Sequence, residues 1–197
     1  MVDAPDSKSG GSNIMRVQVP PPAPFLIVNT FWFWMLSMKK LSADTLRKHK
    51  GISFVGVSTC FFVYDSEGHF YMAKRSNKSR DEKGTWEIGG GGLKWGLTAK
   101  ENLFREIKEE YNATPLKVTF LGYRDVLRSS EEAELTHWVA LDFAVLVNPK
   151  LIKVNEIDMF DDSGWFTLAK LPSPLHSQQL TFFDKYSLQI RTLLGEN

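Results

Sequence analysis

Three glutamates, Glu106, Glu109 and Glu110, lie close together in the segment GGLKWGLTAKENLFREIKEEYNA, beside Arg105 and behind a run of glycines. At about 100° per residue of helix they share one arc beside the apolar face. Like charges at these spacings repel each other, so their clustering indicates a compensating cation. A hard divalent ion such as Mg²⁺ suits carboxylate oxygens and bridges protein to phosphates. A solvated face of glutamate and lysine explains the same pattern, and residues 106–110 alone favour that interpretation.

The helix that carries these glutamates is predicted from Thr98 to about Tyr111. Thr98 followed by Glu101 fits a capping box, and Asn112 tolerates the left-handed conformation that ends helices. One face of this helix is apolar and is expected to pack on the core. Its members are Leu103, Phe104, Ile107 and Tyr111.

The elements around the helix are mostly strands. Residues 52–65 and 70–76 predict a hairpin whose turn is residues 66–69, and residues 86–88 predict a short strand that ends at Gly89. Further strands are expected at 116–127, 136–147 and 164–168, with an acidic loop at 155–162. A terminal helix is predicted from Phe183, Tyr186, Ile190 and Leu193, with Gly195 as its C-cap. This mixture predicts an α/β or α+β sandwich.

Composition indicates an ordinary globular protein with one sizeable domain, because 43% of the 197 residues are apolar and 24% are charged. The formal net charge is +1, so no global field draws the chain to nucleic acid or an anionic membrane. Any phosphate binding must be local. The lone cysteine, Cys60, lies in an apolar run, which predicts a buried thiol in a reducing compartment.

The first 49 residues are expected to be disordered or to precede the true translation start, with the domain at 50–197. Residues 1–24 hold five prolines and no hydrophobic period. Residues 16–24 can be back-translated into a sequence resembling a tRNA T-arm and acceptor end, which favours a start at Met35 or Met38. The apolar residues 25–36 are too few for a membrane span, which needs about 20, and no signal-peptide flanks accompany them. We therefore expect a cytoplasmic protein; a peripheral membrane anchor through residues 25–36 is the alternative.

The glycine run, the spacing and the motif REIKEE together resemble the Nudix box, the loop-helix-loop signature of Nudix hydrolases. In that family a glycine is followed after five residues by Glu, and after seven more by Arg-Glu-aliphatic-x-Glu-Glu-x-Gly and an aliphatic residue. Gly91 starts this pattern here and residues 105–113 complete it in register. Flanking segments at 72–76, 84–90 and 164–172 also resemble the family, so the resemblance covers about residues 50–175. The departures are Leu97 for the upstream Glu, Asn112 for the Gly, and Lys94 where Glu is frequent.

The resemblance implies a Nudix-like α/β/α sandwich with a mixed central sheet. It implies hydrolysis of a nucleoside diphosphate linked to a further group, with Mg²⁺, or Mn²⁺ in its place, held by Glu106, Glu109, Glu110 and the backbone carbonyl near Gly90. Arg105 takes an orienting role in the catalytic set with Glu106 and Glu109. The general base is Glu106, our choice, or an acid of the downstream loop. The loop acids are Glu156, Asp158, Asp161 and Asp162.

Substrate contacts are expected from Arg75, Trp86, Gly91 and Glu156, with Tyr123, Arg124 and Arg128 as further candidates for the pocket lining. The small-molecule substrate is a nucleoside triphosphate, a dinucleotide or a nucleotide sugar such as ADP-ribose, and the chain is a monomer or a homodimer. A Nudix-fold module that binds a nucleotide without cleaving it is the alternative function. Leu97, which has no acceptor group, is the main support for that alternative.

Overall fold

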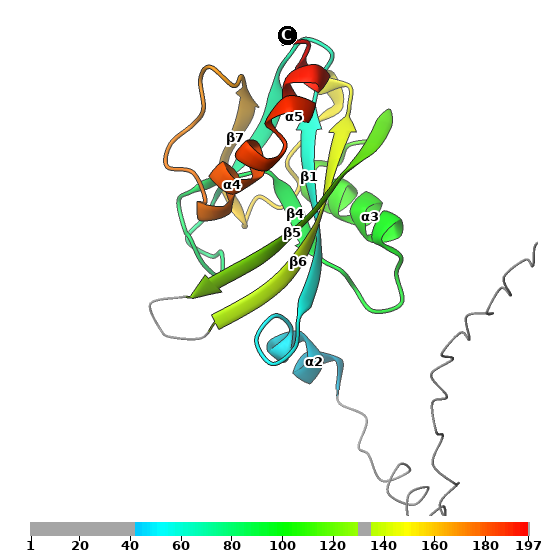
Figure 1. Ribbon diagram of the computed structural model, residues 1–197, viewed down its shortest axis with the longest axis vertical. Helices are drawn as coiled ribbons and strands as arrows, with labels where there is room; N and C mark the ends of the chain where they lie inside the picture. Colours follow the sequence, from blue (N-terminus) through cyan, green and yellow to red (C-terminus); the bar gives the residue numbers. More distant parts are fainter. Residues whose placement is uncertain (1–41, 130–134, 197) are drawn as a thin grey trace, which may run out of the picture. The chain divides into compact units, whose positions relative to one another are not determined.

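A mixed sheet lies between α3 on one side and α4 and α5 on the other in the computed structural model, which describes residues 42–129 and 135–196 (Figure 1). The predicted α/β/α sandwich is confirmed. The strands are β1 (Gly56–Tyr64), β2 (Phe70–Arg75), β3 (Trp86–Glu87), β4 (Gly89–Gly92), β5 (Lys117–Ser129), β6 (Leu135–Leu146) and β7 (Phe160–Phe166). The helices are α2 (Ala43–His49), α3 (Ala99–Tyr111), the short 3₁₀ helix η2 (Pro149–Leu151), α4 (Ser177–Lys185) and α5 (Ser187–Leu194).

The sheet has the order β3-β2-β1-β6-β5, with β4 also paired to β1 and β7 to β2. The predicted hairpin of β1 and β2 is present, while β6 runs parallel to β1 and antiparallel to β5. The glycines predicted to end a strand form β4 instead, pairing along β1 with Gly91 opposite Thr59. Strand β7 begins at Phe160, so Asp161 and Asp162 belong to this strand and not to the predicted acidic loop.

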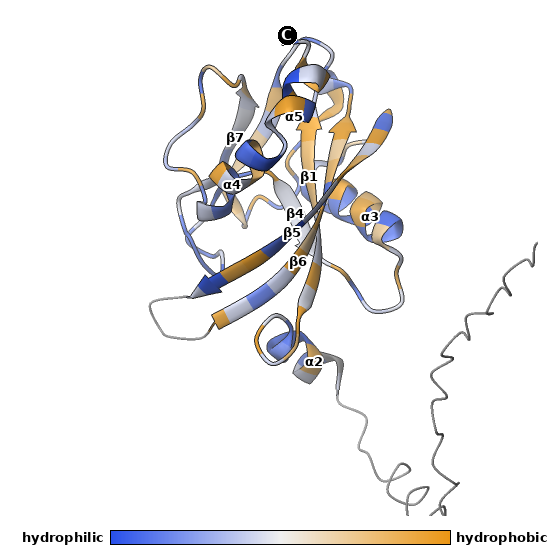
Figure 2. Ribbon diagram, viewed as in Figure 1, coloured by the Kyte–Doolittle hydropathy of each residue, from blue (hydrophilic) through white to orange (hydrophobic). Residues whose placement is uncertain are grey.

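Two hydrophobic cores lie on the two faces of the sheet. Figure 2 shows apolar residues concentrated along β1, β6 and the side of α3 that faces them. The core beneath α3 includes Leu103, Ile107 and Tyr111, all fully buried, as their helical spacing predicted. Phe104 was predicted to join them, but it is 39% exposed. The helix rolls toward its polar side, and Asn102 is buried in place of Phe104.

The second core packs α4 and α5 against the other face of the sheet. The predicted terminal helix is two helices, which meet at Tyr186. Tyr186 is buried, and its hydroxyl donates to Asp142 at 2.9 Å. Asp142 also accepts two hydrogen bonds from Arg124, at 2.8 and 3.0 Å. This bidentate buried pair ties β5 and β6 to α5. Gly195 ends α5 in the left-handed conformation, as predicted.

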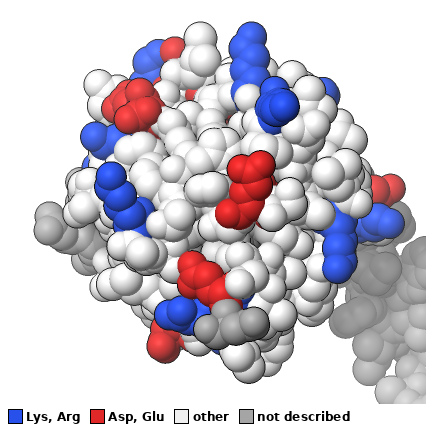
Figure 3. All heavy atoms as spheres, turned by 90° about the horizontal axis from the view of Figure 1, so that it is seen from above, with Lys and Arg blue, Asp and Glu red and all other residues white. Residues whose placement is uncertain are grey.

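Helix α2 falls within the range 1–49, which was expected to lie outside the domain. The predictions for residues 1–24, residues 25–36, Met35 and Met38 concern a part of the chain that the structure does not describe. Across residues 42–129 and 135–196, no helix combines the length and the hydropathy that crossing a bilayer requires. The face seen in Figure 3 carries scattered acidic and basic side chains, in keeping with the near-zero net charge.

Candidate active site

Helix α3 presents two of its glutamates to the glycine strand. The predicted capping box of Thr98 and Glu101 starts the helix, and Asn112 ends it with a φ of 47°. The backbone N–H of Gly90 donates to Glu110 at 3.3 Å. Glu106 is also buried, whereas the side chain of Glu109 is 44% exposed. The acidic face is therefore divided: Glu106 and Glu110 are buried, and Glu109 lies at its exposed rim.

Strand β4 needs glycine because these carboxylates pack directly on its backbone. A Cβ on Gly91 would lie 2.2 Å from Glu106 Oε1, and one on Gly89 would lie 2.2 Å from the Phe61 ring and 2.8 Å from Glu110 Oε2. All of these distances are shorter than real Cβ contacts. The glycine run is thus a cradle for the α3 carboxylates, which explains why these two sequence features occur together.

Arg105 lies across the acidic face and pairs with both Glu106 and Glu109. Its Nη2 also donates to Asn102 Oδ1 at 3.0 Å. Lys94 approaches Glu109 at 3.8 Å from the loop before the helix. These cations neutralise part of the acidic face, although Arg105 sits between the carboxylates that the resemblance implies as metal ligands.

A fourth acid, Glu87, joins this group from β3, and the sequence reasoning missed it. Glu87 lies opposite Ala73, which packs in the core beneath α3, so its side chain is on the α3 side of the sheet. Its side chain is only 18% exposed and pairs with Arg75 at 2.6 Å. A single Glu in a short strand carries no periodic signal; its position next to the glycine run is the one clue that the sequence offered.

The electrostatics of the acid cluster favour a bound cation. Burial, then the charges of Glu87, Glu106 and Glu156, raise the pKa of Glu110 well above its usual value. Burial also raises the pKa of Glu106, against the opposing effect of Arg105. Glu110 Oε2 is buried and has no hydrogen-bond partner within the described residues. An acceptor oxygen buried without a donor is costly, and a hard cation would satisfy it.

The donor set therefore fits a magnesium-type ion, but its oxygens do not converge as they stand. Within the described ranges, the one group of three acidic or histidine side chains with ligand atoms inside 4.8 Å of one another is Asp65, Glu67 and His69, in the β1–β2 turn. In that turn Asp65 accepts hydrogen bonds from the backbone N–H of Glu67 and His69, which explains the cluster without an ion. We favour the α3 group because its unpaired oxygen is buried.

The remaining sequence-predicted residues lie at varied distances from the acid cluster. Arg75 has its guanidinium held by Asp81 and Glu87. Trp86 is buried in the core beneath α4 and α5, with its ring 5.1 Å from that of Phe166. Glu156 is half-buried and close enough to Glu110 to raise its pKa.

Three further loop acids were candidates for the general base. Asp158 is exposed and pairs with Lys78 at 2.6 Å. Asp161 and Asp162 are exposed on β7. Of the four downstream acids, Glu156 is therefore the one that the electrostatics connect to Glu110.

A cavity of about 250 Å³ opens beside the glycine strand, and Glu87 of the acid cluster is among its lining residues. Arg124 and Arg128 line it, as the sequence suggested, whereas Tyr123 does not and is 58% exposed. The apolar wall comes from β5 and β6, and a polar rim comes from the start of α4. The lining also includes Cys60, Val126, Trp138, Ala140, His176 and Gln179. The predicted buried thiol, Cys60, is half-buried as a residue, and desolvation raises the pKa of its thiol to about 12.

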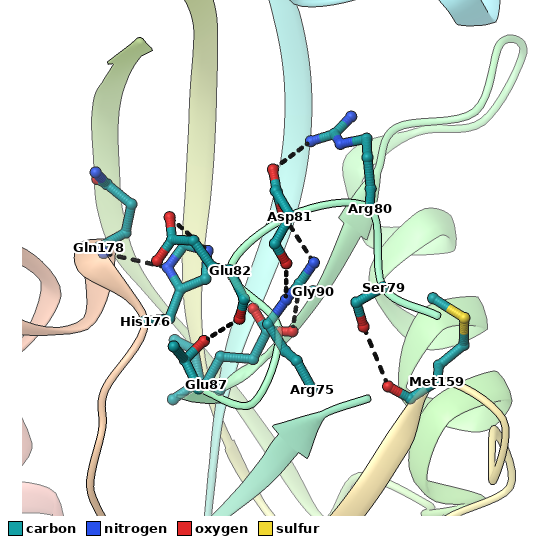
Figure 4. A network of polar contacts seen from close by, with 12 residues as sticks. Arg75, Ser79, Arg80, Asp81, Glu82, Glu87, Gly90, Met159, His176 and Gln178 are labelled. Carbon is teal, nitrogen blue, oxygen red and sulfur yellow. Dashed lines mark hydrogen bonds and ion pairs between the residues drawn. The ribbon is translucent and has the colours of Figure 1, made fainter. Parts of the chain in front are cut away.

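A network of ion pairs fixes the loop between β2 and β3 against this cavity (Figure 4). Asp81 accepts from Arg75 at 2.8 Å and from Arg128 at 3.1 Å. Glu82 accepts from Arg128 at 2.9 Å and from the backbone N–H of Ser177, the first residue of α4, at 2.6 Å. The network therefore connects β2, β5 and α4. Arg128 and its carboxylate partners are far apart in the sequence, so no local pattern predicted the network.

His176 is buried at the centre of the network, between Glu82 and Arg128. Burial lowers the pKa of His176 to about 4, with Arg128 acting in the same direction and Glu82 opposing it. The imidazole is therefore neutral at pH 7, and its Nδ1 accepts the backbone N–H of Gln178 to cap α4.

An α/β/α sandwich with an acidic helix cradled on a glycine strand defines a known class of domain. A family model of the NUDIX domain matches residues 55–186, and the chain belongs to that family. The match confirms the resemblance noted in the box residues. No curated protein matches the chain.

Solved structures share the fold. The MutT NUDIX hydrolase from Burkholderia pseudomallei is 25% identical, with a TM-score of 0.56 over 73% of this chain and 98% of that one. The NUDIX domain of Shewanella oneidensis NrtR, complexed with ADP ribose, is 16% identical, with a TM-score of 0.57 over 77% and 99%. A bifunctional NMN adenylyltransferase/ADP ribose pyrophosphatase from Francisella tularensis, complexed with AMP and a Mn ion, is 16% identical, with a TM-score of 0.52 over 84% and 46%. The last two likenesses show the fold alone.

Proposed function

We propose that this protein is a magnesium-dependent hydrolase that cleaves the diphosphate bond of a nucleoside diphosphate linked to a further group. The observation that carries the proposal is the buried Oε2 of Glu110, which finds no hydrogen-bond partner in the described part of the chain and lies close to the charges of Glu106 and Glu87. Such a cluster of acids is unfavourable by itself and becomes favourable with a divalent cation and a phosphate chain.

Glu106 and Glu110 are the inner metal ligands in this proposal, with Glu109 and the carbonyl of Gly90 at the rim. Mg²⁺ bound there would neutralise phosphate charge and activate water. Mn²⁺ is the natural substitute, and the Mn ion in the Francisella tularensis structure supports that choice. Arg105 orients Glu106 and Glu109, which it already contacts.

The general base remains a choice between Glu106 and Glu156. Glu106 is close to the acid cluster but pairs with Arg105, which favours its ionised form. Glu156 is half-buried and faces the same cluster from the segment before β7. We keep Glu106 as the first candidate. It lies on the same helix as the other proposed metal ligands, so no loop has to move to bring the base to them.

The cavity beside the glycine strand is the proposed site for the nucleoside part of the substrate. Its apolar wall of Val126, Trp138 and Ala140 suits a planar base, and Arg128 and Gln179 offer polar groups at its rim. Gly91, which separates the cavity from Glu106, lets the phosphates pass close to both. Arg75 and Glu156 stay as substrate contacts in the proposal, whereas the buried ring of Trp86 serves packing.

The substrate is proposed to be a nucleoside triphosphate or a nucleotide sugar of the ADP-ribose type. ADP ribose in the Shewanella oneidensis structure supports the second choice. The alternative function, a module that binds a nucleotide without hydrolysis, rests on Leu97, which is half-buried and offers no acceptor.

The test is phosphate or pyrophosphate release from a panel of nucleotides with Mg²⁺ or Mn²⁺, for the wild type and Glu110→Gln. Turnover that requires the metal and is lost in Glu110→Gln supports the hydrolase. Tight nucleotide binding without turnover by the wild type, and turnover gained only in Leu97→Glu, would instead support the binding module.

A further inference from the structure

Asn102 is a polar residue on the buried side of α3, and its exposure is 0%. On the helical wheel Asn102 shares the polar arc of Glu106 and Glu109, yet it is as deeply buried as Leu103 and Ile107 of the core. A buried amide without hydrogen-bond partners would destabilise the fold, so the partners of Asn102 indicate its role.

Each end of the Asn102 amide has a partner. Its Nδ2 donates to Thr59 Oγ1 on β1 at 2.9 Å. Its Oδ1 accepts the backbone N–H of Lys94 at 3.1 Å and Arg105 Nη2 at 3.0 Å. The amide orientation follows from these partners, because the backbone N–H and the guanidinium only donate. Asn102 thus connects the sheet, the loop before α3 and the arginine of the acidic face.

One hydrogen bond to Oδ1 comes from Lys94, which lies in the same loop as Leu97, the position at which the box lacks an acceptor. Leu97 occupies the position that the resemblance gives to a glutamate, and its side chain cannot accept a hydrogen bond. In the loop of residues 93–98, the N–H of Leu97 donates to the carbonyl of Lys94, and Lys94 itself is held by Asn102. The loop and Arg105 therefore depend on Asn102 for an acceptor that Leu97 does not supply.

We propose that Asn102 is a positioning residue that replaces the missing glutamate, holding Arg105 against Glu106 and fixing the loop before α3. This inference rests on the proposed hydrolase function. Arg105 Nη2 contacts both Asn102 and Glu106, so the amide oxygen sets where the guanidinium meets the carboxylate. Without that acceptor, Arg105 keeps its pair with Glu109 at the rim and loses one of its two anchors on the inner side.

Variants that affect the two ends of the Asn102 amide separately can distinguish a positioning role from a role in folding alone. Thr59→Val removes the acceptor of Nδ2 and leaves the bonds to Arg105 and Lys94 in place. Asn102→Leu removes all of these bonds at similar side-chain volume, and Asn102→Asp keeps an acceptor for Lys94 and Arg105. A role limited to folding would give activity losses that follow the melting temperature across the three variants.

The experiment measures kcat, Mn²⁺ affinity, melting temperature and the side-chain Nε–H NMR signal of Arg105 in the full chain. We expect Asn102→Leu to lower kcat or Mn²⁺ affinity about 10- to 100-fold, as removal of an outer-shell partner does. The Arg105 signal should lose its ordered, dispersed position. Thr59→Val and Asn102→Asp should keep kcat within about threefold of the wild type, a loss under about 0.7 kcal/mol. The double variant Asn102→Leu with Leu97→Glu should recover most of the activity that Asn102→Leu loses, up to about tenfold.

Three outcomes would overturn the inference. They are an Arg105 signal unchanged in Asn102→Leu, a loss of kcat in Thr59→Val equal to that in Asn102→Leu, and no recovery from Leu97→Glu. The NMR signal also separates this inference from the proposed function. A wild type that neither turns over nucleotides nor binds Mn²⁺ refutes the hydrolase, while the Arg105 signal still reports whether Asn102 holds the guanidinium.

Discussion

Adding one methyl group to the glycine strand should disable the acidic face while the fold survives. In Gly91→Ala, the new Cβ would lie 2.2 Å from Glu106 Oε1, where ordinary contact begins at 3.4 Å. The carboxylate must therefore move by at least about 1.2 Å, the difference between these distances. Gly91 has an ordinary φ, and the atoms it would meet are the end of a flexible side chain, so the backbone can stay in place.

A misplacement of about 1 Å in a catalytic group costs about 100-fold in rate, or about 2.7 kcal/mol of transition-state stabilisation. We therefore expect kcat of Gly91→Ala to fall about 100-fold on whichever nucleotide the wild type hydrolyses. The melting temperature should stay close to that of the wild type, because alanine in a strand interior is no worse than glycine.

Gly92→Ala is the matched control in the same strand. Its Cβ would meet Lys50 Nζ at 3.5 Å and the Trp138 ring at 3.6 Å, both ordinary contacts. The new methyl would lie beside the cavity wall and away from Glu106, so we expect this variant to keep kcat within about threefold of the wild type, a loss under about 0.7 kcal/mol. Equal kcat in the two alanine variants would refute the reasoning, since it would mean that the position of Glu106 does not matter for the chemistry.

Three further predictions concern single residues. Glu110→Gln should abolish turnover and raise the melting temperature of the metal-free protein, because it removes a buried like charge; a lower melting temperature would contradict this. The pKa of His176 is about 4 in the folded protein and 6.5 for an ordinary histidine, so the unfolded chain binds the extra proton and stability falls as pH drops from 6.5 to 4. The loss is at most about 3.4 kcal/mol, and urea titrations of His176→Asn should show a flatter pH profile in that window. Gly51→Ala should destabilise the fold by about 2 kcal/mol or more in urea unfolding, because φ is +81° and its Cβ would lie 2.1 Å from Trp138 Nε1; an unchanged midpoint would count against this.

Much of the fold could be predicted because its signals are local. The capping box at Thr98, the left-handed Asn112 and the buried faces of α3 follow from short-range spacing, and the structure has all of them. Phe104 was misplaced because a helical wheel shows which residues share a side but not how far the helix rolls against the sheet. The glycine strand was mistaken for a strand end because β propensity is low for glycine, and the packing that demands glycine comes from a distant helix.

The site was only partly predictable, because some of its residues come together only in the tertiary structure. Glu106 and Glu110 share a helical arc, so the sequence placed them together, and the structure buries both. Glu87 and His176 reach the site from segments 19 or more residues away from that arc, and their pairing with Arg75 and Arg128 is a product of tertiary structure. Asn102 looked like an ordinary polar residue until its partners were known.

The most direct test of the account is a Mn²⁺ titration of the full chain, followed by electron paramagnetic resonance, beside Glu110→Gln and Glu67→Gln. Glu67 belongs to the acid group of the β1–β2 turn and serves as the matched control. We expect the wild type and Glu67→Gln to bind Mn²⁺ alike, and Glu110→Gln to lose this binding. Binding that survives in Glu110→Gln and disappears in Glu67→Gln would contradict the claim that α3 carries the metal site.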